Sequence, residues 1–376
     1  MKKNKFYTFI MALIVSSRAF AVDGGAKNIF TKQQSDSLRN YLWKFPVNTQ
    51  LSIAMVQDGK VTYAGIVLDK DTFHIVENRD SVFEIGSLSK VFTSVLLSSF
   101  VNRGIVKLDD PVKSFFDFPL LHSGIGGKEI TLENLANHTS GLPRIDMSMF
   151  DIAGMDPNNP YKNYDEKALD DYLQNKMKLD SVPGTKFSYS NLGGGLLGFI
   201  LCKKAHKTYE QLLQEFIFVP LGMESSTTNL AAVKGHLVKG HNAQGDTAES
   251  WTFTDASAGA GAIRSNAQDM VKFMQANFTA NKMYDLPREK TFSINNSLDI
   301  GLAWLIKKAK NKPAPDGSGG NDIYWHNGGT GGYRSCLAMD VKERNGVIIL
   351  SNVSPAHKLN SNIDKLCFAL LSTISR

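Results

Sequence analysis

A serine and a lysine lie one helical turn apart in the stretch Phe83-Glu84-Ile85-Gly86-Ser87-Leu88-Ser89-Lys90-Val91-Phe92. Residues i and i+3 of a helix share a face, so the Lys90 amine can reach the Ser87 oxygen. A serine hydroxyl attacks efficiently only when a neighbouring group takes its proton. The positive end of the helix dipole favours the neutral amine that this task requires. The pair predicts a nucleophile with its base, and the alternative is a helix N-terminus with an exposed lysine.

Two further motifs follow in the chain. Tyr189-Ser190-Asn191 is a Tyr-x-Asn, and His326-Asn327-Gly328-Gly329-Thr330-Gly331-Gly332 begins with a His-x-Gly. In order and spacing, the three motifs resemble those of the class C β-lactamase group, which also contains D-Ala-D-Ala peptidases, D-aminopeptidases and β-lactamase-like esterases. Segments 104–112, 130–143 and 220–223 resemble the same family. The resemblance therefore covers nearly all of the chain after residue 21.

The periodicity of the chain predicts sheet at both ends and helix between them. Asp58-Gly59 separates Leu51–Gln57 from Lys60–Val67 as a hairpin turn does, and Asn345-Gly346 predicts the turn of a second hairpin between strands 333–340 and 347–352. Apolar residues at helical spacing predict helices over 31–45 and 359–374. We expect an α+β fold, an antiparallel sheet flanked by helices with an inserted, mostly α-helical domain. The sheet part is assigned to about 22–86 and 255–376, and the helical part to about 87–254.

The resemblance implies a groove between the two parts in which Ser87 forms an acyl-enzyme. Lys90 and Tyr189 are the expected catalytic partners. Tyr189 would accept the Ser87 proton directly or through Lys90, pass it to the leaving group, and later activate water. Tyr161-Lys162-Asn163 is a second Tyr-x-Asn, but it follows a turn-rich loop. We therefore favour Tyr189 over Tyr161.

The expected substrate-binding residues are Asn191, His326, Gly328 and Gly329. Asn191 would hold the substrate amide or steady Lys90, and the alternative role is a helix cap. The backbone N–H groups of Ser87 and Gly329 would form the oxyanion hole that the family pattern implies.

His326 stands where class C β-lactamases have the lysine of Lys-Thr-Gly, a motif that this chain lacks. A histidine is mostly neutral at pH 7 and offers a hydrogen bond rather than a permanent charge. Arg334 is interpreted as an exposed strand residue, and the alternative is that it supplies the missing charge. His138, in a segment His-Thr-Ser-Gly-Leu-Pro, is interpreted as a structural turn residue.

The N-terminal segment 1–21 has the basic start, apolar middle and Ala-x-Ala end of a signal peptide. Its removal lowers the formal net charge from +6 to +2, because it holds four basic residues and no acidic one. We expect a periplasmic or secreted monomer without a membrane span. Basic residues do not form a stripe with interleaved aromatics, so nucleic acid is not an expected partner.

Three cysteines, Cys202, Cys336 and Cys367, lie far apart in apolar stretches and are interpreted as buried thiols. We expect no metal and no cofactor. The leading hypothesis is an exported serine hydrolase acting on β-lactams or D-Ala-type peptides. A carboxylesterase or D-aminopeptidase of the same fold is the first alternative, and a slow-turnover penicillin-binding sensor is the second. A metal-dependent hydrolase has no supporting residue cluster.

Overall fold

The computed structural model describes residues 21–22, 29–70, 72–309 and 320–374. The predicted signal peptide, apart from Ala21, lies outside these residues. A ten-stranded sheet runs through one half of the molecule, in the order β1-β4-β3-β2-β14-β13-β12-β11-β10-β9. All neighbouring strands are antiparallel except β1 and β4. The strands are β1 Ala21–Val22, β2 Gln50–Gln57, β3 Lys60–Asp69, β4 Thr72–Val76, β9 Phe292–Asn295, β10 Leu298–Ile300, β11 Leu305–Lys307, β12 Ile323–Gly329, β13 Arg334–Asp340 and β14 Asn345–Ser351.

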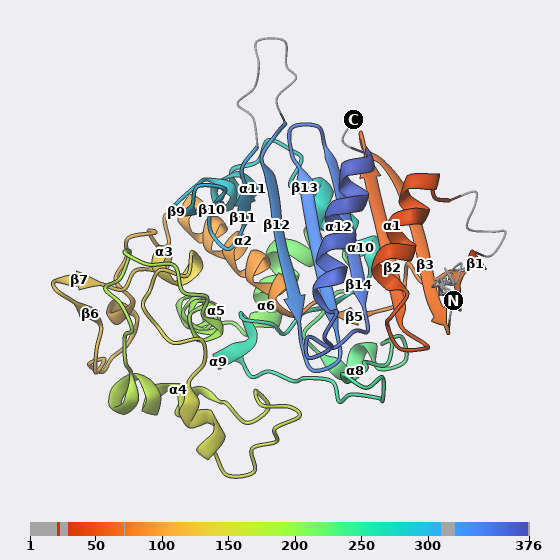
Figure 1. Ribbon diagram of the computed structural model, residues 1–376. Helices are drawn as coiled ribbons and strands as arrows, with labels where there is room; N and C mark the ends of the chain where they lie inside the picture. The colour runs from red at the N-terminus through yellow and green to blue at the C-terminus, as the bar shows by residue number, and fades with distance from the viewer. Residues whose placement is uncertain (1–20, 23–28, 71, 310–319, 375–376) are drawn as a thin grey trace, which may run out of the picture.

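The centre of the sheet joins the two ends of the chain. β2 lies beside β14, with Ile53 opposite Ile349. Figure 1 shows this pairing as an orange strand next to a blue one. The expectation of an α+β fold with an antiparallel sheet built from both ends is confirmed. The boundaries assigned to the sheet part and the helical part stay a prediction.

Helices cover both faces of the sheet, and further helices form the other half of the molecule (Figure 1). The helices are α1 Lys32–Leu42, α2 Ser89–Asn102, α3 Leu132–Ala136, α4 Glu166–Asp171, α5 Asn191–Ala205, α6 Tyr209–Leu213, α7 Val219–Leu221, α8 Leu230–Val233, α9 Asp255–Ala258, α10 Ala267–Ala276, α11 Lys282–Asp285 and α12 Ser361–Ile374. Two short pairs of strands complete the fold, β5 Phe83–Glu84 with β8 Arg264–Ser265 and β6 Gly124–Ile125 with β7 Lys128–Glu129.

Alternating side chains of β14 enter two separate apolar cores. Val347 and Ile349 pack in the core that includes residues of α1 and α12, whereas Ile348 and Leu350 pack in the larger core that includes residues of α2, α5 and α10. Successive residues of a strand point to opposite faces, so a strand buried on both faces must be apolar at every position. Removal of this apolar surface from water supplies the main stabilising free energy.

The expected turn at Asn345-Gly346 is wrong. The turn lies at residues 341–344 instead. Asn345 and Gly346 both belong to β14, where Asn345 lies opposite Asp340 and Gly346 opposite Met339. The glycine has a packing role, because a Cβ at Gly346 would lie 2.3 Å from the sulfur of Met274 on α10. Arg344 instead adopts the positive φ of the turn, at 53°.

Among the described residues, no helix combines the length and the apolar character that crossing a bilayer demands. The three cysteines are buried and free, as expected of buried thiols.

Candidate active site

Ser87 lies in a single 3₁₀ turn, Gly86–Leu88, that leads directly into α2. Gly86 has a φ of +53°, and a Cβ there would lie 2.5 Å from the backbone nitrogen of Gly329. Only glycine fits such a position, because an L side chain would meet both the strained φ and the neighbouring backbone. On the strand side, the Ser335 hydroxyl donates to the Ile85 carbonyl over 2.7 Å. These contacts hold the turn against β12 and β13.

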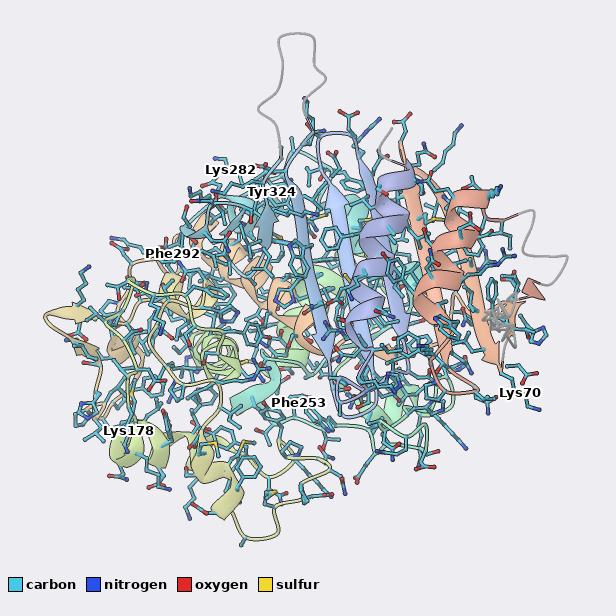
Figure 2. The ribbon with its side chains drawn as sticks, in the orientation of Figure 1. Lys70, Lys178, Phe253, Lys282, Phe292 and Tyr324 are labelled. Carbon is cyan, nitrogen blue, oxygen red and sulfur yellow. The ribbon has the colours of Figure 1, made fainter. Side chains whose placement is uncertain are left out.

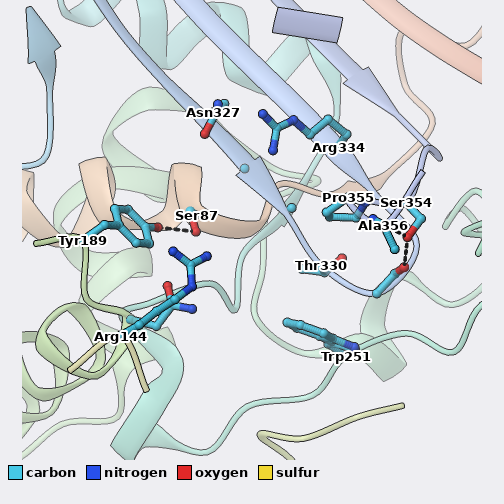
Figure 3. A pocket seen from close by; sticks show the side chains of 14 residues that line it. Ser87, Arg144, Tyr189, Trp251, Asn327, Thr330, Arg334, Ser354, Pro355 and Ala356 are labelled. Carbon is cyan, nitrogen blue, oxygen red and sulfur yellow. Dashed lines mark hydrogen bonds between the residues drawn. The ribbon is translucent and has the colours of Figure 1, made fainter. Parts of the chain in front are cut away.

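Two polar side chains meet at the Ser87 hydroxyl. The Tyr189 hydroxyl donates to Ser87 Oγ over 2.6 Å, and Lys90 Nζ lies 3.2 Å from the same oxygen. Figure 3 shows the Tyr189 hydroxyl directed at Ser87, with a dashed line for this hydrogen bond. Tyr189 lies two residues before the start of α5 and is 102 residues from Ser87 in the chain. The structure therefore brings Ser87, Lys90 and Tyr189 together.

The Lys90 amine is enclosed by oxygen atoms. Besides Ser87 Oγ, Nζ lies 2.9 Å from Asn191 Oδ1 and 2.6 Å from the Ala260 carbonyl. Burial, with a smaller contribution from the charge of Arg144, holds the pKa of Lys90 well below its ordinary value. A neutral amine matches this surrounding, because its two N–H groups serve the two pure acceptors and its lone pair faces the one hydroxyl that can donate.

Asn191 is oriented by a second tyrosine. Its Nδ2 group donates to the Tyr161 hydroxyl over 3.1 Å, which turns Oδ1 toward Lys90. Tyr161 thus stands behind Asn191 and is not a hydrogen-bond partner of Ser87. Its ring stacks on Phe253, with centroids 4.8 Å apart, and Phe253 is labelled in Figure 2 where the helical half meets the end of the sheet. Ser190, rather than Asn191, is the helix cap of α5.

Tyr189 is held in its protonated form at neutral pH. Burial raises the pKa of Tyr189 to about 12, against the lowering effects of the Ser87 hydrogen bond and of Arg144 and Arg334. The ring is packed against His138, with centroids 4.5 Å apart. His138 has a φ of 60° and accepts a hydrogen bond at Nδ1 from the Ser190 backbone N–H. This placement agrees with the structural role expected for His138.

The glycines of β12 lie directly against the nucleophile turn. A Cβ at Gly328 would lie 1.9 Å from the Ile85 carbonyl oxygen, and one at Gly329 would lie 2.5 Å from Pro355. Close passage of two backbones is a common reason for glycine in a strand. Ser87 and Gly329 both line the pocket, and the oxyanion hole formed by their backbone N–H groups stays a prediction.

His326 is buried, at 2% exposure, and does not line the pocket beside Ser87. Its Nδ1 lies 2.6 Å from the Asn327 carbonyl. Burial is the main cause that lowers the pKa of His326 to about 3. The ring is therefore uncharged at neutral pH.

A pocket of about 480 Å³ opens over Ser87. Its lining includes Tyr189, Asn191, Gly328 and Gly329 together with residues that the motifs did not single out for the site: Arg144, Trp251, Asn327, Thr330, Gly331, Ser354, Pro355 and Ala356. Arg144 follows the His-Thr-Ser-Gly-Leu-Pro segment directly, which is the signal by which it could have been found. In the part of the chain that the structure describes, no group of three His, Cys, Asp or Glu side chains could hold a metal ion.

Arg334 is not the exposed strand residue of the sequence interpretation. Its side chain is 15% exposed and lines the pocket. The guanidinium forms an ion pair with Asp364 of α12, and Asn327 Nδ2 donates to the same carboxylate over 2.7 Å. The sequence pattern of the strand could not reveal this ion pair, because Asp364 is 30 residues away, on a helix that packs over the sheet.

The fold that surrounds this serine-centred pocket is the β-lactamase/transpeptidase-like fold. The chain belongs to the Beta-lactamase family, whose sequence model matches residues 49–366.

Individual relatives cover most of the chain. It is 24% identical over 390 residues to the D-alanyl-D-alanine-carboxypeptidase/endopeptidase AmpH of Escherichia coli K12, covering 97% of this chain and 95% of the relative. It is 25% identical over 356 residues to a β-lactamase of Pseudomonas fluorescens, covering 84% and 94%. A crystal structure of a β-lactamase/D-alanine carboxypeptidase from Pseudomonas syringae superimposes with a TM-score of 0.73 at 19% identity, covering 90% of this chain and 98% of the other.

Proposed function

We propose that the chain is an exported serine hydrolase that forms an acyl-enzyme on Ser87, with β-lactams or D-Ala-type peptides as its substrates. One observation carries the proposal: Ser87 Oγ lies within hydrogen-bond distance of both the Tyr189 hydroxyl and the Lys90 amine. Family membership supports a hydrolase of this fold. The basic and apolar pattern of residues 1–21 supports export.

Lys90 takes the first proton in this proposal. Burial lowers the pKa of Lys90 and raises that of Tyr189, so the amine is the base of the pair and the phenol is the acid. Ser87 Oγ attacks the substrate carbonyl carbon while its proton passes to Lys90. The carbon–nitrogen bond then breaks, and Tyr189 donates its proton to the leaving nitrogen. The sequence interpretation left open whether Tyr189 accepts this proton directly or through Lys90.

Deacylation reverses the proton transfers. The Tyr189 phenolate takes a proton from the attacking water, and the Lys90 ammonium returns its proton to Ser87 Oγ as the ester bond breaks. Lys90 Nζ lies 5.0 Å from the centre of the Tyr189 ring, so the ammonium stabilises the phenolate between the two stages. Backbone N–H groups of Ser87 and Gly329 receive the negative charge that develops on the carbonyl oxygen.

The test is an intact-mass time course with a penicillin, run beside Ser87→Ala. We expect an adduct on the unchanged chain and none on the variant. An adduct that turns over indicates a β-lactamase, whereas a persistent adduct indicates a peptidase or a slow-turnover penicillin-binding sensor. If no adduct forms and no β-lactam is lost, short-chain esters and D-amino-acid amides test the carboxylesterase and D-aminopeptidase alternatives. Full activity of Ser87→Ala on any of these substrates would overturn the serine mechanism.

A further inference from the structure

The pocket over Ser87 carries positive charge without a compensating acid in its wall. Among the described residues that line it, Arg144 and Arg334 are cationic and none is acidic. Like charges in a concave site with low-dielectric walls reinforce each other and attract an anion. The lining alone therefore favours a substrate with negative charge near its reacting bond.

The two arginines differ in what they already bind. Arg334 is neutralised by Asp364, which contacts its guanidinium through both carboxylate oxygens. An arginine held in such an ion pair has little charge left for a ligand. Arg334 is therefore part of the wall of the pocket.

The Arg144 guanidinium forms no hydrogen bond or ion pair with another residue that the structure describes, and its side chain is exposed. The guanidinium lies over the face of the Tyr189 ring, 5.0 Å from the ring centre. Asp146, the nearest acid in the sequence, is already bound by the Ser148 backbone and hydroxyl and by the Tyr164 hydroxyl. The N–H donors of Arg144 are thus available to a ligand.

The main chain of Arg144 is fixed even though its side chain is not paired. Its carbonyl accepts hydrogen bonds from the backbone N–H groups of Asn191 and Leu192, over 2.8 and 3.2 Å. These N–H groups belong to the first turn of α5, which lacks internal acceptors for them. The helix that positions Asn191 therefore also positions Arg144. Figure 3 shows the guanidinium directed into the pocket toward Ser87.

We propose that Arg144 binds a carboxylate of the substrate and makes the protein selective for acyl donors that carry one beside the scissile bond. A guanidinium lying over an aromatic ring keeps its in-plane N–H groups free for the two oxygens of a carboxylate. Arg144 thereby supplies the cation that His326, buried and neutral, does not. This inference rests on the proposed acylation of Ser87.

Binding of a carboxylate at Arg144 should also raise the pKa of Lys90. Arg144 contributes to the lowered pKa of Lys90. A bound carboxylate offsets that charge, so Lys90 holds the serine proton more readily once the substrate is in place. A substrate without a carboxylate lacks this effect.

The experiment compares penicillin G with its carboxylate methyl ester as acyl donors, followed by intact mass of the full chain. We expect the unchanged chain to acylate about 10- to 100-fold faster with the free carboxylate, the range for hydrogen bonds to a charged group. Arg144→Ala should abolish this preference by slowing the carboxylate reaction alone, and Arg144→Lys should retain part of it. Arg39→Ala, which removes an exposed positive charge on α1, should leave both rates unchanged.

The outcomes separate the two proposals. If Ser87 is acylated but Arg144→Ala keeps the preference, the carboxylate role is overturned while the serine mechanism stands. If no acyl donor modifies Ser87, the proposed function fails, and calorimetry on the unchanged chain decides the role of Arg144. D-alanyl-D-alanine should then bind more tightly than its C-terminal amide, and Arg144→Ala should remove the difference. Equal binding of the two dipeptides would overturn the proposal.

Discussion

The helical and sheet walls of the pocket are made of different chemical parts. The helical wall presents the side chains of Ser87, Arg144, Tyr189 and Asn191, whereas the sheet wall consists largely of the backbone from Gly328 to Gly331. A side chain on the helical wall can lose a functional group while the shape of the site is kept. The glycines of the sheet wall pack closely against Ile85, Pro355 and Trp251, so any added side chain changes the shape. Substitutions on the helical wall should therefore reduce activity alone, whereas substitutions on the sheet wall should reduce both activity and stability.

The largest expected effect is on the helical wall, from Tyr189→Phe. The variant keeps the ring that packs on His138 and loses only the hydroxyl that donates to Ser87. Loss of a general acid should slow acylation by about 10²- to 10⁴-fold. The melting temperature should stay within a few degrees, which differential scanning fluorimetry measures. A large fall in melting temperature would show that the Tyr189 hydroxyl also supports the packing of the helical wall, which would contradict the contrast between the two walls.

The pH profile of acylation identifies which group takes the first proton. Lys90 accepts a proton only when neutral, so the rate should fall as pH drops through its pKa and should level off well below pH 10.5, because burial lowers that pKa. Tyr189→Phe should keep this acid limb at a reduced rate. A rate that instead rises tenfold per unit up to pH 10 would assign the first step to ionised Tyr189, whose pKa is about 12.

On the sheet wall, Gly328→Ala should reduce both activity and stability. The new Cβ would lie 1.9 Å from the Ile85 carbonyl, so the strand or the nucleophile turn must move. Overpacking of this kind costs about 1–3 kcal/mol, and a shift of 1 Å at the site can cost about 100-fold in rate. Chemical denaturation and acylation kinetics on the same sample measure the two losses. Unchanged stability would contradict the contrast between the walls.

The smallest effect is expected from Tyr161→Phe. Asn191 Nδ2 loses its acceptor, but the ring and its stacking on Phe253 remain. Loss of one hydrogen bond of about 0.5–1.5 kcal/mol corresponds to about a 2- to 12-fold slower acylation. Steady-state kinetics beside Tyr189→Phe test the ranking of the two tyrosines. A loss as large as that of Tyr189→Phe would place Tyr161 in the chemistry itself.

The sequence predicted the parts of the site that short motifs specify. Ser87 and Lys90 are one turn apart on a helix, so their proximity follows from local geometry, and the flanking sequence distinguished Tyr189 from Tyr161. The sheet at both chain ends followed from strand periodicity. The free Arg144 was missed because its place beside Tyr189 depends on a loop docking against α5. The Asn345-Gly346 turn failed because contact with Met274 outweighs local turn preference there.

The pairing of β2 with β14 has a consequence for how the chain folds. The strand at 50–57 finds its central neighbour only when residues 345–351 are available. Contacts between segments so distant in sequence raise the contact order and slow folding. During synthesis, the β2 edge of the first hairpin has no strand partner until β14 has been made, near the end of the chain. A chain arranged in this way completes its sheet late, which is compatible with the proposed export of the chain before it folds.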